Sequence, residues 1–184
     1  FSMQDIELIH GFEYFFNVRA KDMVGNVSDA GSSDGITVDI EPPILGSVFE
    51  ANNNNPIFFG VDSIISIFWS SGDDLSGIKL LEHSFGSSPS DSDIVSWQSS
   101  AIGDSGAILS NLSLSDGVTY YASVMAVDSA GNSSMLTGDG VTIDISSPDV
   151  GWVHDVNSLS QDTAQVFTPS LSALTSLWSG FSDS

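Results

Sequence analysis

Hydrophobic and polar residues alternate with a period of two near the start of the chain. In residues 14–20, YFFNVRA, the side chains of Tyr14, Phe16, Val18 and Ala20 occupy every second position. Successive side chains of a strand point to opposite faces of a sheet, so this pattern predicts a half-buried β-strand.

Other segments show the same alternation. Ile65, Ile67 and Trp69 predict a strand over residues 61–69, and residues 77–86, GIKLLEHSFG, predict another. We find no segment with a helical period of 3.6 residues. Short strands separated by turns rich in Gly, Ser, Asp and Asn predict an all-β fold of the β-sandwich type.

The chain repeats one segment. Residues 15–43 and 121–148 are closely similar, with an offset of 106 residues that becomes 105 after a one-residue gap. A shorter and weaker match joins residues 66–74, SIFWSSGDD, to residues 175–183, TSLWSGFSD. The main matched positions are Tyr14 and Tyr120, Val18 and Val124, Ala20 and Ala126, Asp22 and Asp128, Gly25-Asn26 and Gly131-Asn132, and residues 35–40 with 140–145.

The repeat predicts the domain organisation, because a period of about 105 residues is a common size for one compact domain. Residues 1–43 would be the C-terminal half of a sandwich, residues 44–147 a complete sandwich, and residues 148–184 the N-terminal half of the next. Two explanations remain open. The sequence is either a window on a longer tandem array, or a chain whose ends complete neighbouring copies head-to-tail, an arrangement that generates fibres.

Specific motifs carry a family resemblance. Residues 8–14, LIHGFEY, and residues 112–120, LSLSDGVTY, both contain Leu-x-x-Gly-x-x-Tyr, which resembles the tyrosine corner of fibronectin type III and immunoglobulin-like sandwiches. Trp69 and Trp178 resemble the tryptophan of their second strand. The segments AVDSAGN, GVTIDISSP and WSGFSDS resemble tandem repeats of large extracellular surface proteins.

The resemblance covers nearly the whole chain and implies tandem immunoglobulin-like, fibronectin type III-like β-sandwiches. Members of such families serve as stalks, adhesins, filament subunits and spacers beside enzymes. The chain departs from the repeat at residues 51–60, ANNNNPIFFG, which we interpret as an exposed loop leading into the strand at residues 61–69.

Composition is compatible with an extracellular module. The chain has 3 Lys and Arg against 24 Asp and Glu, a net charge of −21, which argues against binding nucleic acid or an anionic membrane through basic residues. The same charge permits divalent cations or cationic partners. Cysteine is absent, and no apolar run is long enough to insert into a membrane. We expect an extracellular or cell-surface location.

Residues suited to catalysis are scattered. His10, His83 and His154 lie in three different predicted units without ligand spacing, so we interpret them as structural. The sequence has no Gly-x-Ser-x-Gly elbow, and GDSG at residues 103–106 is interpreted as a turn. We therefore expect a protein that is not an enzyme and needs no organic cofactor.

Repeated aspartates are candidates for a metal site. Asp22 and Asp128 precede the Gly-Asn turns, where we expect them to accept hydrogen bonds from nearby amides. Asp39 and Asp144 would simply point outward from a strand. Calcium at domain junctions is a second hypothesis, but the chain has no Asp-x-Asp-x-Asp loop, and we favour the simpler interpretation. The calcium candidates are Asp39, Glu41, Asp144 and Asp149.

Three asparagines match the rule for N-linked glycosylation: Asn26 in NVS, Asn111 in NLS and Asn132 in NSS. Asn26 and Asn132 are repeat equivalents in a predicted exposed turn, so attached sugars would stand clear of the core. A serine-rich chain also produces such triplets by chance, and Gly-Asn also serves the turn itself.

These observations favour a structural subunit or segment of an extracellular, glycosylated filament or stalk, whose partners are neighbouring copies or adjacent repeats. A second hypothesis is an adhesive or glycan-binding module, in which Trp97, Trp152, Phe58 and Phe59 would stack on sugars. We expect instead that Trp97 covers the edge of the core and Trp152 the interdomain junction. A third hypothesis is a non-catalytic spacer of a secreted enzyme.

Overall fold

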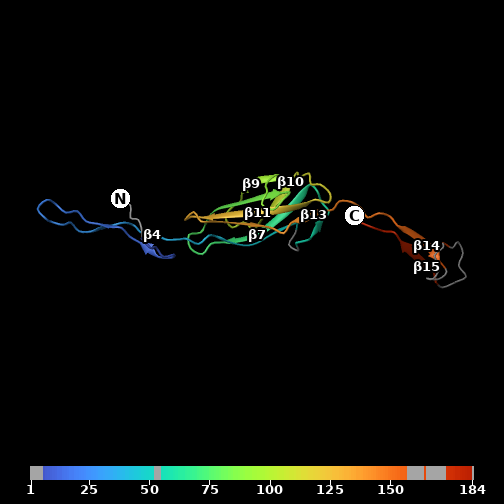
Figure 1. Cartoon of the computed structure of the whole chain (residues 1–184), viewed down its shortest axis with the longest axis horizontal. Coiled ribbons are helices and arrows are strands. Elements are labelled where there is room, and N and C mark those ends of the chain that lie inside the picture. The colour runs from blue at the N-terminus through green and yellow to red at the C-terminus, as the bar shows by residue number, and fades with distance from the viewer. Residues whose placement is uncertain (1–5, 52–54, 157–163, 165–172, 184) are drawn as a thin grey trace. The chain divides into compact units, whose positions relative to one another are not determined.

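A computed structural model describes residues 6–51, 55–156, 164 and 173–183. The protein is all-β, and its described residues form strands and turns without a helix (Figure 1). No helix within these residues is therefore long and apolar enough to cross a membrane. Contacts divide the chain into two compact units, residues 1–143 and 144–184, which are described separately.

The first unit begins with an arm, defined as residues 6–43, and continues with a body, defined as residues 44–143. The arm contains only two-residue strands, whereas the body contains strands of up to ten residues. The strands of this unit are β1 (Glu13–Tyr14), β2 (Asn17–Val18), β3 (Gly31–Ser32), β4 (Ile36–Thr37), β5 (Ile44–Glu50), β6 (Phe58–Phe59), β7 (Ile64–Gly72), β8 (Ile78–Gly86), β9 (Val95–Ser99), β10 (Gly106–Ser110), β11 (Thr119–Asp128), β12 (Ser133–Thr137) and β13 (Val141–Ile143).

Two sheets of the body share one hydrophobic core. One has the strand order β10-β7-β5, and the other has the order β6-β13-β11-β8-β9, with β12 also paired to β11. Neighbouring strands run antiparallel except β6 and β13, which are parallel. Because both sheets contribute inward-facing residues to one cluster, the body is consistent with the predicted β-sandwich.

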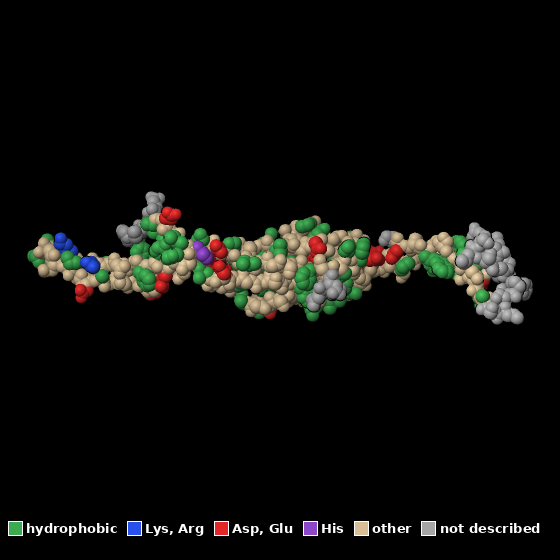
Figure 2. Space-filling model, turned by 90° about the horizontal axis from the view of Figure 1, so that it is seen from below, with side chains coloured by type: hydrophobic (Ala, Val, Ile, Leu, Met, Phe, Trp, Pro, Cys, Tyr) green, Lys and Arg blue, Asp and Glu red, His purple; other side chains and the backbone are tan. Residues whose placement is uncertain are grey.

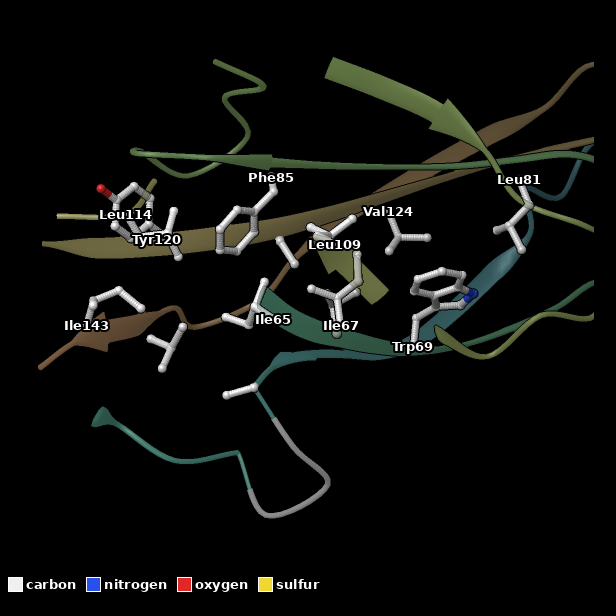
Figure 3. Packing of buried hydrophobic residues seen from close by; sticks show 14 of the residues in the cluster. Ile65, Ile67, Trp69, Leu81, Phe85, Leu109, Leu114, Tyr120, Val124 and Ile143 are labelled. Atoms are coloured by element: carbon white, nitrogen blue, oxygen red, sulfur yellow. The ribbon is translucent and has the colours of Figure 1, made fainter. Parts of the chain in front are cut away.

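The core follows the alternation read from the sequence. Every second residue of β11 is buried, and Ile65 and Ile67 of β7 are buried opposite them. Figure 3 shows these β7 side chains pointing toward Phe85 and Val124 of the other sheet. Trp69 closes one end of the core, where its ring stacks on His83 at 5.5 Å and its Nε1 donates a 2.8 Å hydrogen bond to the carbonyl of Asp104.

The predicted strand at residues 14–20 is broken in the structure. Only β1 and β2 form there, paired with β4 and β3, and the predicted inner face is largely open, with Phe16 50% and Val18 69% exposed. Residues 36–40, ITVDI, also alternate and would be the next strand, but only β4 forms there. In the body, the equivalent strand β11 pairs with β8, and the opposite sheet packs against its inner face. The described residues of the arm include neither a long partner strand nor a facing sheet.

The interpretation of residues 51–60 as a plain exposed loop was wrong in part. Ala51 is buried, and Phe58 and Phe59 form β6, which pairs with β13. Phe58 is exposed, as expected, but Phe59 packs against the core. Residues 52–54 lie outside the described residues, so the prediction is not assessed there.

The second unit, described alone, contains β14 (Trp152–Val156) and β15 (Thr175–Ser179). They pair antiparallel, and an isolated bridge joins Asp149 to Ser182. Trp152 stacks on His154 with ring centroids 4.4 Å apart. Trp178, the repeat equivalent of the buried Trp69, is 69% exposed.

Candidate functional site

The turn after β11 fixes one carboxylate of the candidate site. Asp128 is buried, and its Oδ1 accepts hydrogen bonds from the amides of Gly131 (2.6 Å) and Asn132 (2.8 Å). Asn132 Nδ2 donates to Asp128 Oδ2 at 2.8 Å. Burial alone would raise the pKa of Asp128, but these donors outweigh it and lower the pKa.

The arm repeats this turn. Asp22 Oδ1 accepts a 2.8 Å bond from the amide of Asn26, and Asn26 Nδ2 donates to Asp22 Oδ2 at 2.8 Å. The side-chain bond from Asn26 is the main reason that the pKa of Asp22 is lowered. Gly25 and Gly131 adopt φ values of 101° and 100°, a left-handed conformation that favours glycine. The predicted turn-capping role of both aspartates is confirmed.

The tyrosine motif also repeats in three dimensions. The hydroxyl of Tyr120 accepts a 3.0 Å hydrogen bond from the amide of Ser115, five residues earlier. The hydroxyl of Tyr14 accepts the corresponding bond, also 3.0 Å, from the amide of Ile9. These contacts are set by residues close in the sequence, and they form in the arm as well as in the body.

The expectation that Asp39 simply points outward was wrong. Its side chain is only 2% exposed, because the segment after β4 passes between His10 and the loop that joins β7 to β8. Asp39 Oδ2 accepts a 3.2 Å bond from the amide of Ser76, and Oδ1 accepts one of 3.2 Å from the amide of Glu41.

The same segment is held by the turn after β11. Asn132 Nδ2 lies 3.2 Å from the carbonyl oxygens of both Asp39 and Glu41, and Ser134 Oγ donates a 2.6 Å bond to the carbonyl of Pro43. The end of the arm is therefore fastened to the body by polar contacts.

Three aspartates from different parts of the first unit come together here. Asp39, Asp73 and Asp128 each place one carboxylate oxygen within 4.8 Å of the other two. A second group, His10, Glu41 and Asp74, meets the same distance limit. In Figure 2 a histidine and acidic side chains gather on one face of this unit. The sequence had suggested Asp39 and Glu41 but not Asp73 as ligands, because Asp73 lies 34 positions after Asp39 in the chain.

An open pocket of about 570 Å³ adjoins the cluster, and both arm and body line it. Leu8 and Val38 come from the arm, while Leu75 and Ala130 come from loops of the body. Asp39 borders the pocket as well, so the carboxylate group lies beside a partly apolar recess.

The other two calcium candidates lie in the second unit. Asp144 is partly buried, and its Oδ1 accepts a 3.3 Å bond from Ser146 Oγ. Asp149 is exposed, and its amide donates a 2.7 Å bond to the carbonyl of Ser182. Among the described residues, neither belongs to a cluster that could hold a metal ion.

The three glycosylation candidates differ in their surroundings. Asn26 and Asn111 are exposed, and Asn111 has a positive φ of 58°. Asn132 is partly buried, and its Nδ2, the atom to which a glycan would be attached, already contacts Asp128, Asp39 and Glu41. Glycosylation of Asn132 would therefore compete with the contacts that hold the arm.

The two histidines other than His10 have local structural contacts. His83 is buried, its Nδ1 lies 2.8 Å from Ser100 Oγ, and burial lowers its pKa. The ring of His154 packs on Trp152. Trp97 is partly buried on β9. A turn at residues 102–103 leads into GDSG at residues 103–106, and the last residue of this segment, Gly106, begins β10.

Sequence reasoning missed one ionisable group in the core. Glu50 is fully buried, its Oε1 accepts a 2.7 Å bond from the amide of Ala122, and its Oε2 has no hydrogen-bond partner among the described residues. Gly138, in the segment that joins β12 to β13, leaves room for this carboxyl group, because a Cβ atom there would clash with it. Burial and, to a smaller extent, nearby Asp139 raise the pKa of Glu50 to about 7. The signal was its alternation with Val48 on β5.

Comparisons with known proteins give no match: no family model fits this sequence, and a search of curated proteins found none similar to it.

Proposed function

We propose that this chain is a segment of an extracellular structural stalk or filament built from tandem immunoglobulin-like β-sandwiches. The observation that carries the proposal is the three-dimensional repetition of the tyrosine and aspartate turns. The hydroxyls of Tyr14 and Tyr120 each accept a hydrogen bond from the amide five residues earlier. Asp22 and Asp128 accept hydrogen bonds that fix the same turn. A chain that rebuilds one local structure after a domain-sized interval is typical of tandem arrays.

The strand order of the body supports the immunoglobulin-like assignment. If β5, β7 and β10 are strands A, B and E, and β8, β11 and β12 are C, F and G, the two sheets have the membership A-B-E and C-F-G. This division matches the immunoglobulin-like sandwich, apart from its strand D and the additional short strands β6 and β13. The strand β9 beside β8 would then be C′.

The exposed apolar residues at both ends support the tandem arrangement. Phe16 and Val18 in the arm and Trp178 in the second unit are exposed, whereas their repeat equivalents Ala122, Val124 and Trp69 are buried in the body. Adjacent repeats that supplied the missing strands would bury this surface at a gain of roughly 25 cal/mol per Å². Partners of this kind would be further repeats or neighbouring copies of the chain.

Immunoelectron microscopy tests the proposal. Antibodies raised against the recombinant chain should label fibres or stalks on the surface, or in the secretions, of the cells that make the protein. Labelling of isolated particles, or of the cell interior, would contradict it. Selective, saturable binding of the chain on a glycan array would favour the adhesive module instead.

A further inference from the structure

The carboxylates of Asp39, Asp73 and Asp128 form a concentrated negative charge. Asp39 comes from the segment after β4, Asp73 from the loop between β7 and β8, and Asp128 from the end of β11. The side chains of Asp39 and Asp128 are almost completely shielded from solvent. Carboxylates this close repel one another, and burial makes the repulsion stronger because water screens it less.

The neighbouring hydrogen-bond donors leave one oxygen of this group without a partner. Asp73 Oδ2 accepts bonds from the amides of Leu75 (3.2 Å) and Gly77 (2.5 Å). Asp73 Oδ1 is buried from solvent and has no hydrogen-bond partner among the described residues. A buried carboxylate oxygen without a donor is costly, and this orphan oxygen is independent evidence for a missing positive charge.

The described protein groups do not supply that charge. The whole chain has three Lys and Arg residues, and the ion pairs found within the described residues both involve His10. His10 Nδ1 lies 3.4 Å from Asp39 Oδ1, but it also accepts a 3.3 Å bond from the amide of Ile40. One histidine beside Asp39 offers at most one positive charge, which is fewer than the three carboxylates of the group carry.

We propose that Asp39, Asp73 and Asp128 bind a calcium ion. The three ligands are carboxylates, the hard oxygen donors that Ca²⁺ prefers, and no histidine or cysteine belongs to the group. Water or carbonyl oxygens would complete its coordination. The chain's own repeat retains two of these positions, as Asp22 for Asp128 and Asp144 for Asp39.

The position of the ion gives it a mechanical role. One ligand belongs to the arm and two belong to the body, Asp73 in a loop and Asp128 at the end of β11, so the ion would fasten the arm to the body beside Asn132. In the proposed stalk, which this role presupposes, each junction of this type would stiffen when calcium is present. The ion-binding site itself does not depend on the proposed function.

Calorimetric titration of the full chain with CaCl₂ tests the site. We expect saturable binding with a dissociation constant of about 10⁻⁴–10⁻³ M, as in extracellular calcium modules, and a higher melting temperature with calcium. Asp73→Asn and Asp128→Asn should each weaken binding about tenfold or more and reduce the thermal shift. Near-UV circular dichroism of the tryptophans verifies that each variant is folded.

Two matched variants locate the ion. Asp29→Asn removes one exposed charge from the arm, and Asp74→Asn removes the neighbouring carboxylate, which belongs to the second group. Both should bind calcium about as well as the unaltered chain. The proposal is overturned by the absence of saturable binding, by equal weakening in all four variants, which indicates diffuse attraction, or by loss of binding in Asp74→Asn alone. None of these results depends on the microscopy that tests the stalk.

Discussion

The arm and the body carry the same sequence pattern but differ in how much structure it produces. Both form the tyrosine hydrogen bond and the aspartate turn. In the body, β11 extends over ten residues, and its inward side chains are buried; in the arm, the equivalent segment forms only two-residue strands. Turns are therefore specified by residues a few positions apart, whereas long strands require a partner strand and a facing sheet.

The tryptophan pair should show the largest difference between complete and incomplete units. Trp69→Ala removes a ring that is 3% exposed and should lower the free energy of unfolding by about 3–5 kcal/mol. Trp178→Ala removes the repeat-equivalent ring, which is 69% exposed, and should change it by less than about 0.5 kcal/mol. Urea denaturation followed by far-UV circular dichroism measures both. Equal losses would show that the second unit is packed like the body.

Glu50 should make the stability of the body depend on pH near neutrality. Its folded pKa of about 7 lies above its ordinary value of 4.5, so the folded protein binds the proton more tightly than the unfolded chain. The stabilisation is fully present below pH 4.5 and is lost as the pH rises through 7. The loss is on the order of 3 kcal/mol.

Urea unfolding at pH 5 and pH 8 checks this dependence. Glu50→Gln should reduce the difference in stability between the two pH values, whereas Glu13→Gln, at an exposed position of β1, should leave it unchanged. The interpretation fails if both variants retain the full pH dependence of the unaltered chain.

The glycosylation sequons allow the equivalent turns of the arm and the body to be compared, and the expected difference is smaller. Asn26 and Asn132 occupy equivalent turns, but Asn132 Nδ2 also contacts the segment after β4. When the chain is secreted from eukaryotic cells, glycan occupancy should be higher at Asn26 and Asn111 than at Asn132. Glycopeptide mass spectrometry measures the three occupancies. Higher occupancy at Asn132 than at Asn26 would contradict the contacts of Asn132 with the segment after β4.

The sequence predicted the features that depend on local periodicity. Alternation identified β7 and β8, the match to the alternating residues 14–20 indicated the buried face of β11, and the repeated Asp-x-x-Gly-Asn segments identified two turns. It did not predict the short strands of the arm, because their length depends on which partner strands are present.

The features missed from the sequence arise from contacts between distant residues. Asp73 lies close to Asp39 and Asp128 only because three separate segments of the chain meet where the arm contacts the body. Glu50 is buried where its carboxyl group accepts a hydrogen bond from the amide of Ala122, 72 positions later in the chain. Neither contact leaves a local pattern, apart from the position of Glu50 on the inward face of β5.

Hydrogen exchange of the full chain, followed amide by amide, tests most directly whether a sandwich is complete only where both halves of the repeat are present. We expect the amides of β11 to exchange only through global unfolding, and those of residues 14–20 to exchange many orders of magnitude faster. Equal, strong protection of the two segments would contradict it, because the arm would then be a stable structure without further repeats.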